Sequence, residues 1–320
     1  MTASYDKNSA IVVLPPVARG RLRDRKLRSW LAQSDLRPDD GPRELLHRIT
    51  AAAGLPYPDS GMAALRMWGQ TGDRPTVWLA GADPVYLEPQ LDRLCVHALR
   101  RGSVRSGDLG PLFDHLQSTL AEGADYGFAR LGSCGYLRAN EAIATAKLPP
   151  YVIDGEPPDD YLPSGEAAAG HRKLISEIEM TLHEHEVNLR RVQAGLQPIN
   201  SLWLWGGGKA PEKVTRPQPP LYSDDPLLAG YWESATAVAD PWPGSIDECI
   251  HGSVAGFVAV VPRSAGGSDT LEMCLRQLQE ALRNGRLSHI IALFRDGIRA
   301  DIRRSHAVRF WRRSSALLDD

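Results

Sequence analysis

The stretch Asn200-Ser201-Leu202-Trp203-Leu204-Trp205-Gly206-Gly207-Gly208 decides how this sequence is interpreted. Its apolar half predicts a buried strand over residues 201–205, and the three glycines predict a loop at 206–208. A strand that runs into a glycine loop brings backbone N–H groups close to an anion. A nucleotide-binding P-loop is excluded, because Trp203 stands where its first glycine is needed and Ala210 where its hydroxyl is needed. Two interpretations stay open, an anion-accepting turn and a plain tight turn.

A long helix is predicted directly before this strand, over residues 171–194. Apolar side chains recur there at helical spacing, and Gly195 and Pro198 follow as stop signals. His183 and His185 lie two positions apart, so on a regular helix they point about 200° away from each other. We therefore expect no shared metal between them, and we expect His185 to be buried and hydrogen-bonded on the apolar stripe.

The remaining pattern is that of an α/β protein. Buried or alternating apolar runs predict strands at 11–14, 76–79, 93–99, 254–261 and 289–294. Helical periodicity covers 109–122 and 271–283, and residues 82–87 are rich in turn formers. The five prolines between Lys147 and Gly165 favour an extended connector. We expect an N-terminal α/β lobe over 1–147, a Pro-rich connector over 148–165, and a C-terminal α/β lobe over 166–320 that carries the Trp-x-Trp-Gly-Gly-Gly motif.

Composition excludes several functional classes. With 320 residues, 42% of them hydrophobic, the chain is long enough for two lobes with sizeable cores. Lys and Arg number 37 against 39 Asp and Glu, a formal net charge of -2, so no global basic field attracts nucleic acid. No apolar run approaches the ~20 residues of a membrane helix. The four cysteines form no Cys-x-x-Cys pair, and the N-terminus lacks the apolar core of a signal peptide. We expect a reduced, cytoplasmic protein that binds neither nucleic acid nor membrane.

Several segments together resemble a known family. They are His185-Glu186-Val187-Asn188, Arg191, Gly195, Pro198 and Asn200 to Gly208, with Ala82 to Leu87, Leu162 to Gly165 and Arg309-Phe310-Trp311-Arg312-Arg313 in support. This set resembles the RpfE-type bacterial regulatory proteins over most of the chain. From His185 to Gly208 it also resembles the archaeal type of cofactor-independent phosphoglycerate mutase. The resemblance implies a phosphoglycerate-mutase or alkaline-phosphatase-like α/β fold in two lobes.

The same resemblance would imply phosphoryl transfer through a serine nucleophile and two divalent metals. Such a site needs carboxylates and imidazoles that converge on both ions. The Asp-Gly pair expected after the first strand is replaced here by Leu14-Pro15-Pro16-Val17-Ala18-Arg19-Gly20, and His251, His289 and His306 stand alone in sequence. We therefore predict a degenerate fold with no catalytic residues, no metal site and no cofactor. Under the alternative of an active mutase, the protein would hold Mn, Mg or Zn.

The predicted function is binding. A small phosphorylated or otherwise anionic metabolite would be held at the glycine stretch by the residues Asn188, Arg191, Asn200, Trp203, Trp205, Gly206, Gly207, Gly208 and Lys209. For four of these a structural interpretation stays open: Asn188 and Asn200 would instead cap the helix and fix the strand entry, and both tryptophans would be core residues. A further alternative is a protein partner bound by the arginine-rich face from Arg309 to Arg313.

Overall fold

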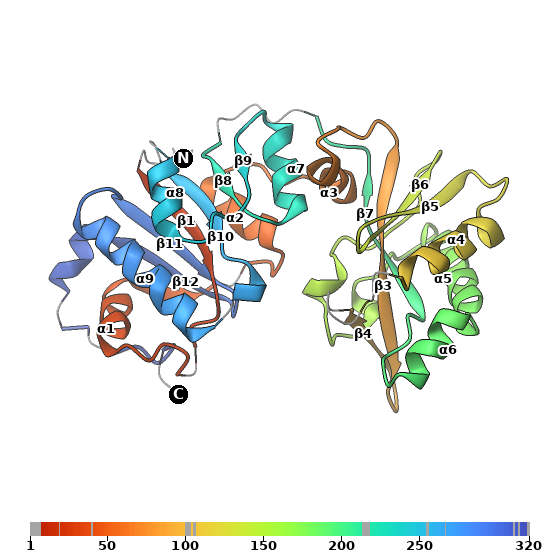
Figure 1. The fold of residues 1–320 in the computed structure, drawn as a ribbon, viewed down its shortest axis with the longest axis horizontal. Coiled ribbons are helices and arrows are strands. Elements are labelled where there is room, and N and C mark those ends of the chain that lie inside the picture. The colour runs from red at the N-terminus through yellow and green to blue at the C-terminus, as the bar shows by residue number, and fades with distance from the viewer. Residues whose placement is uncertain are drawn as a thin grey trace. The chain divides into compact units, whose positions relative to one another are not determined.

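A computed structural model describes residues 8–18, 20–39, 41–99, 104, 107–212, 218–253, 256–265, 267–309, 311–312 and 314–318. The chain divides into two compact units: unit 1 consists of Met1–Tyr57 and Lys213–Asp320, and unit 2 of Pro58–Glu212. Figure 1 shows this division in its colours, because unit 1 combines red and orange segments with cyan and blue ones. Unit 2 is therefore an insertion between two halves of unit 1. Both units contain sheets and helices, which confirms the α/β class.

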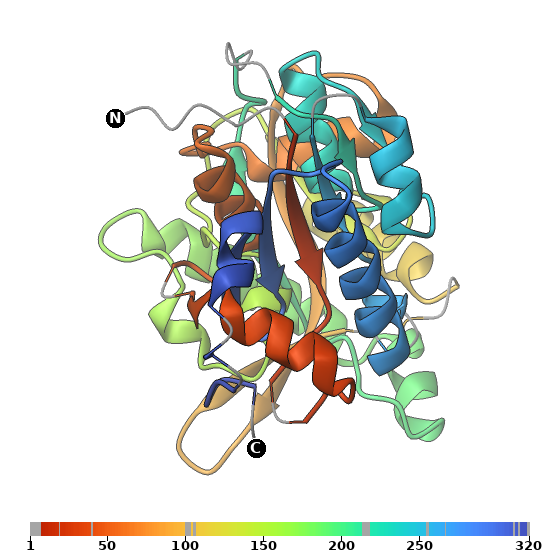
Figure 2. The same ribbon diagram turned by 90° about the vertical axis from the view of Figure 1, so that its left-hand side faces the viewer.

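Unit 1 is built on a mainly parallel sheet. In the described residues it has seven strands, in the order β2 (Asp35–Pro38), β12 (Ile298–Arg303), β11 (His289–Phe294), β1 (Ser9–Leu14), β10 (Phe257–Val260), β8 (Leu221–Tyr222) and β9 (Ala239–Asp240). From β11 to β9 neighbouring strands are parallel, whereas β12 pairs antiparallel with β11 and β2. Figure 2 shows β1 in red beside β11 in blue.

Helices cover the sheet of unit 1, which explains why β1 is buried along its whole length. They are α1 (Arg25–Gln33), α2 (Leu45–Ala53), α7 (Pro226–Ser234), α8 (Ile246–Gly252) and α9 (Ser268–Arg283), with 3-10 turns η3 (Arg263–Ala265) and η4 (Arg304–Val308). Alternate residues of β1, namely Ala10, Val12 and Leu14, belong to one core with Leu27 of α1 and Leu275 of α9.

Unit 2 is built on an antiparallel sheet. Its strands are β3 (Trp78–Pro89), β4 (Leu94–Ala98), β5 (Tyr126–Leu131), β6 (Cys134–Ala139) and β7 (Ser201–Gly208). The long strand β3 pairs with β7 and also with β6 and then β4. Its helices are α3 (Met62–Thr71), α4 (Leu109–Leu120), α5 (Ala168–His183) and α6 (Glu186–Gln193), with η1 (Pro150–Val152) and η2 (Pro158–Asp160). Apolar residues of α4 and α5 pack with those of β3 and β7 in one core.

The predicted domain boundaries differ from the observed division. Residues 148–165 do not separate two lobes, since they lie inside unit 2 and bond to β4: Val96 and Glu156 share a backbone hydrogen bond, and Ala98 N donates to Asp154. The motif strand β7 likewise pairs with β3, far earlier in the chain, and not with β10 or β11. Pairing between distant strands therefore determines the units, and proline content does not reveal it.

Two local predictions are also corrected. Residues 82–87, which were expected to form turns, are the middle of β3. Pro84 lies at the point at which β3 changes partner from β6 to β4. The sheet therefore loses no hydrogen bond through the N–H group that proline lacks. The single helix predicted over 171–194 is two helices, because His185 is extended and caps α6 by accepting from Val187 N at 3.2 Å. His185 is thus a partly exposed cap.

Other expected elements are present. The predicted strands at 11–14 and 289–294 correspond to β1 and β11, and the helix at 271–283 lies within α9. Residues 254 and 255 of the predicted strand at 254–261, together with Arg19, Phe310 and Arg313, lie outside the described residues. In the part of the chain that the structure describes, no helix combines the length and apolar character needed to cross a bilayer.

Candidate functional site

The three glycines of the motif lie in a strand and not in a loop. Gly206 N donates to Ala146 O at 2.8 Å, and Gly207 N donates to the Thr145 hydroxyl at 3.0 Å. These two N–H groups are therefore used inside the protein. The glycines instead permit close packing: a Cβ at Gly206, whose φ is +60°, would lie 2.9 Å from Met62 Cβ, and one at Gly208 would lie 2.5 Å from Gly61 N. Helix α3 can approach β7 only because both side chains are absent.

Asn188 and Arg191 hold the connection between α6 and β7. The Asn188 amide donates to Leu182 O and Ile199 O and accepts from Ile199 N, each at 2.8 Å. The buried Arg191 guanidinium donates to Gln197 O and pairs with Asp108 at 2.6 Å. Both polar side chains are thus bonded to groups of the protein itself.

Asn200 and the two tryptophans are fixed in the same way. Asn200 accepts from Leu87 N at 2.7 Å and donates to Leu87 O at 2.9 Å, so it fastens β7 to β3. Trp203 and Trp205 are buried, and Trp203 Nε1 donates to Leu148 O. Lys209 follows the strand as an exposed residue. The predicted residues thus lie together along β7 and the segment that leads into it. There Asn188, Arg191, Asn200 and Trp203 bond to other groups of the protein.

A buried charge cluster lies beside the motif, and sequence reasoning missed it. Arg66 of α3 is 7% exposed, donates to Asp83 of β3 at 2.6 Å, and lies over the rings of Tyr136 and Trp205. Asp83 also accepts from Trp205 Nε1 at 2.8 Å and from Gly135 N at 3.3 Å. Every donor group of the Arg66 guanidinium has a partner, since Nε donates to Tyr136 and Nη2 to Gly135 O. The cluster therefore joins α3, β3, β6 and β7.

In unit 1 the place to seek a ligand site is the carboxyl edge of the parallel strands, where open α/β sheets bind ligands. β1 ends at Leu14 and continues into Pro15, Pro16 and Val17, which offer no carboxylate. The loop instead presents two adjacent N–H groups, since Val17 N and Ala18 N both donate to Asp296 Oδ2, at 2.7 and 2.8 Å. Asp296 is an exposed residue that follows β11. The β1 loop thus already holds one anionic oxygen.

Other carboxylates near this edge serve helix termini and backbone. Asp225 caps α7 by accepting from Leu227 N, and Asp224 accepts from Trp242 N. Glu44 caps α2. The pKa of the Glu44 carboxyl is raised, mainly because the side chain is buried and also because the charge of Asp225 is near. Across the described ranges, no group of three or more His, Cys, Asp or Glu side chains is arranged to hold a metal ion.

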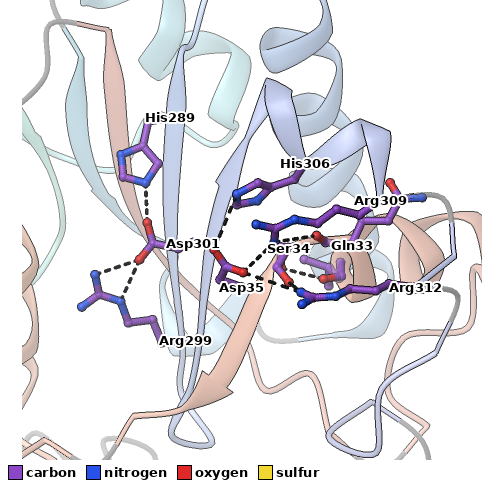
Figure 3. A network of polar contacts seen from close by, with 10 residues as sticks. Gln33, Ser34, Asp35, His289, Arg299, Asp301, His306, Arg309 and Arg312 are labelled. Carbon is purple, nitrogen blue, oxygen red and sulfur yellow. Dashed lines mark hydrogen bonds and ion pairs between the residues drawn. The ribbon is translucent and has the colours of Figure 1, made fainter.

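The arginine-rich C-terminal face forms an internal network (Figure 3). Asp35 pairs with Arg309 at 2.6 Å, with Arg312 at 3.6 Å and with His306 at 3.5 Å. Beside it, Asp301 bonds to His289 and pairs with Arg299. Arg309 and Arg312 thus hold the C-terminal segment against Asp35 of β2. Trp311, which lies between these two arginines, is 65% exposed.

Comparison with known proteins relates part of the chain to phosphoglycerate mutases. No family model matches the chain. The 2,3-bisphosphoglycerate-independent phosphoglycerate mutase of Methanosarcina acetivorans is 48% identical over 71 residues, 22% of this chain and 18% of that protein. The probable mutase of this kind from Geobacter sulfurreducens is 29% identical over 135 residues, 41% of this chain and 33% of that protein. The matches therefore span less than two thirds of these relatives.

A comparison of folds gives a similar protein. The cofactor-independent phosphoglycerate mutase of Thermoplasma acidophilum aligns over 92% of this chain and 89% of its own, with a TM-score of 0.45 and 17% identity.

Proposed function

We propose that the protein is a cytoplasmic, RpfE-type regulatory relative of the phosphoglycerate mutases, which binds a small phosphorylated or otherwise anionic ligand and has no two-metal phosphoryl-transfer site. The observation that carries this proposal is the β1 loop. Where the resemblance places a metal-binding carboxylate, this chain has Pro15, Pro16 and two N–H groups that converge on the Asp296 carboxylate. The two N–H groups are suited to an anionic oxygen, whereas a metal site needs the opposite polarity.

We accordingly propose the β1 loop as the ligand site. A phosphate or carboxylate oxygen would take the position that Asp296 Oδ2 occupies, and the exposed Asp296 side chain would then turn into the solvent. The partial sequence relation to phosphoglycerate mutases supports a phosphorylated three-carbon acid as the first ligand to test. The N–H groups of Gly206 and Gly207 are less suited, because they donate to Ala146 O and Thr145.

The test uses the competition between Asp296 and the ligand. Asp296→Ala removes the internal carboxylate and leaves both N–H groups in place, so 3-phosphoglycerate should bind at least about threefold tighter to this variant than to the wild type by calorimetry. Asp92→Ala removes one exposed carboxylate from unit 2 and controls for the change in net charge. Equal affinities in all three proteins would contradict a ligand site at the β1 loop. Absence of binding in all three would contradict 3-phosphoglycerate as a ligand.

Two alternatives give different results. An active mutase would bind Mn, Mg or Zn and would lose its rate on chelation. A protein-interaction module that uses the Arg309 to Arg313 face would lose partner capture when Arg312 and Arg313 are replaced. Against the second, Arg312 and Arg309 already pair with Asp35.

A further inference from the structure

The corner between α5 and α6, residues 184 and 185, is held by a histidine (Figure 1). His185 has an extended backbone, and its Nδ1 accepts a hydrogen bond from Val187 N at 3.2 Å. A backbone N–H can only donate, so Nδ1 presents a lone pair and the ring proton lies on Nε2. The cap therefore exists only while the ring is neutral, whereas the Asn or Ser of an ordinary cap does not titrate near neutral pH.

A second imidazole lies against this ring. The ring centroid of His115, on α4, is 5.0 Å from that of His185, and both side chains are half-buried. Two imidazolium cations at this distance repel each other, and a cation at a helix N-terminus also opposes the helix dipole. A protonated His185 would in addition turn an N–H toward the N–H of Val187. All three effects favour the neutral ring in the folded protein.

The other titratable or charged side chains around this ring are exposed. They are His183, Glu184, Glu186 and Arg190. Burial lowers the pKa of the His185 imidazole, the charge of His115 lowers it further, and the opposite charge of Glu186 does not offset them. Because this pKa lies below the ordinary value of 6.5, the cap's contribution to stability is fully present above about pH 6.5 and is lost as the pH falls below it.

Loss of the cap would reach the interior of unit 2. Val187, whose N–H would be released, is fully buried. The neighbouring Asn188 bonds across the corner to Leu182 O and to Ile199 O, each at 2.8 Å. These bonds join α5 and α6 to the segment that enters β7. A first turn of α6 that opens would therefore loosen the connection to the motif strand.

We propose that this corner is an acid-sensitive switch: protonation of His185 at Nδ1 removes the α6 cap, and the first turn of α6 opens together with its connection to β7. The added proton comes from the solvent, and the hydrogen bond from Val187 N is the contact that it breaks. The switch does not depend on the function proposed above, because none of its residues belongs to the β1 loop.

The test follows single amide and imidazole groups of the full chain by NMR between pH 7 and pH 5. Hydrogen exchange of the Val187 amide, corrected for the intrinsic pH dependence of exchange, should show at least about a tenfold loss of protection. The imidazole signal of His185 should titrate with the same midpoint, below pH 6.5. Amides of α9 in unit 1 should keep their protection. Unchanged protection of Val187, an equal loss in α9, or a His185 midpoint at or above pH 6.5 would overturn the proposal.

Three variants assign the effect to the capping ring. His185→Asn keeps a capping oxygen at every pH, so Val187 should stay protected at pH 5. His183→Asn is the matched control, because it removes an exposed imidazole that does not cap α6, and it should respond to acid as the wild type does. His115→Gln removes the neighbouring cation and should move the His185 midpoint to higher pH. An acid response that persists in His185→Asn, or that disappears in His183→Asn, would refute a switch at His185.

Discussion

Breaking the ion pair between Arg66 and Asp83 on one side only should strongly destabilise unit 2. The two side chains are 8% and 14% exposed and their charged atoms lie 2.6 Å apart. Removing one member of a buried pair leaves an uncompensated charge, which costs about 3–5 kcal/mol. Asp83 would keep the Trp205 donor in an Arg66→Met variant, yet this neutral donor does not replace a cation. We therefore expect Arg66→Met and Asp83→Leu each to lower the free energy of unfolding by about 3–5 kcal/mol.

The assay is urea unfolding followed by circular dichroism, with a double-mutant cycle. The double variant should lose less than the sum of the two single variants, with a coupling energy of about 2 kcal/mol or more, because it leaves no lone charge buried. Arg276→Met is the matched control, since Arg276 is 58% exposed in its pairs with Asp24 and Glu272 and should cost less than about 1 kcal/mol. A loss in Arg66→Met no greater than in this control, or additive losses in the cycle, would show that Arg66 and Asp83 do not act as a coupled buried pair.

The further predictions concern four single positions. Asn188→Ala should lower the free energy of unfolding by about 3 kcal/mol in urea titration and leave 3-phosphoglycerate affinity unchanged, because Asn188 bonds only to backbone groups of this chain. Gly135→Ala should cost about 2–3 kcal/mol in the same assay, since the new Cβ would lie 1.8 Å from Ala82 O, whereas Gly170→Ala should stabilise α5 by up to about 1 kcal/mol. Burial alone would raise the pKa of Asp301, but hydrogen bonds from His289 and Arg299 lower it from 3.8 to about 2. The folded-state pKa lies below the unfolded one, so this stabilisation is present above about pH 4 and is lost as pH falls toward 2. Asp301→Asn should remove that part of the acid dependence of the melting temperature.

The sequence pattern predicted those strands and helices whose own apolar residues show how they are buried. The continuous apolar runs of β1 and β11 are buried on both faces of a parallel sheet, so hydrophobicity alone marks them. Helix α9 has one apolar face packed on that sheet, and its periodicity marks it equally well.

The failures have physical causes that lie outside the local sequence. Gly206 looks like a loop residue, but it is needed for the close approach of Met62, which is far away in the chain. The helix before the motif breaks at His185, whose extended backbone caps α6, and Asn188 bonds across this break to Leu182 O, a contact that periodicity does not record. The sequence did not indicate that Arg66 is a buried charge. Its pairing with Asp83 depends on how α3 packs against β3 and β7, which no local pattern shows.

On the function proposed above, the protein binds a phosphorylated ligand without metal. The most direct measurement is calorimetric titration of 3-phosphoglycerate into the full chain, first in excess chelator and then after dialysis against Mn and Mg, with the metal content of each sample determined by mass spectrometry. We expect the same affinity in both samples and no stoichiometric metal in either. Binding that appears only with Mn or Mg, together with close to two metal ions per chain, would contradict it and would support an active mutase.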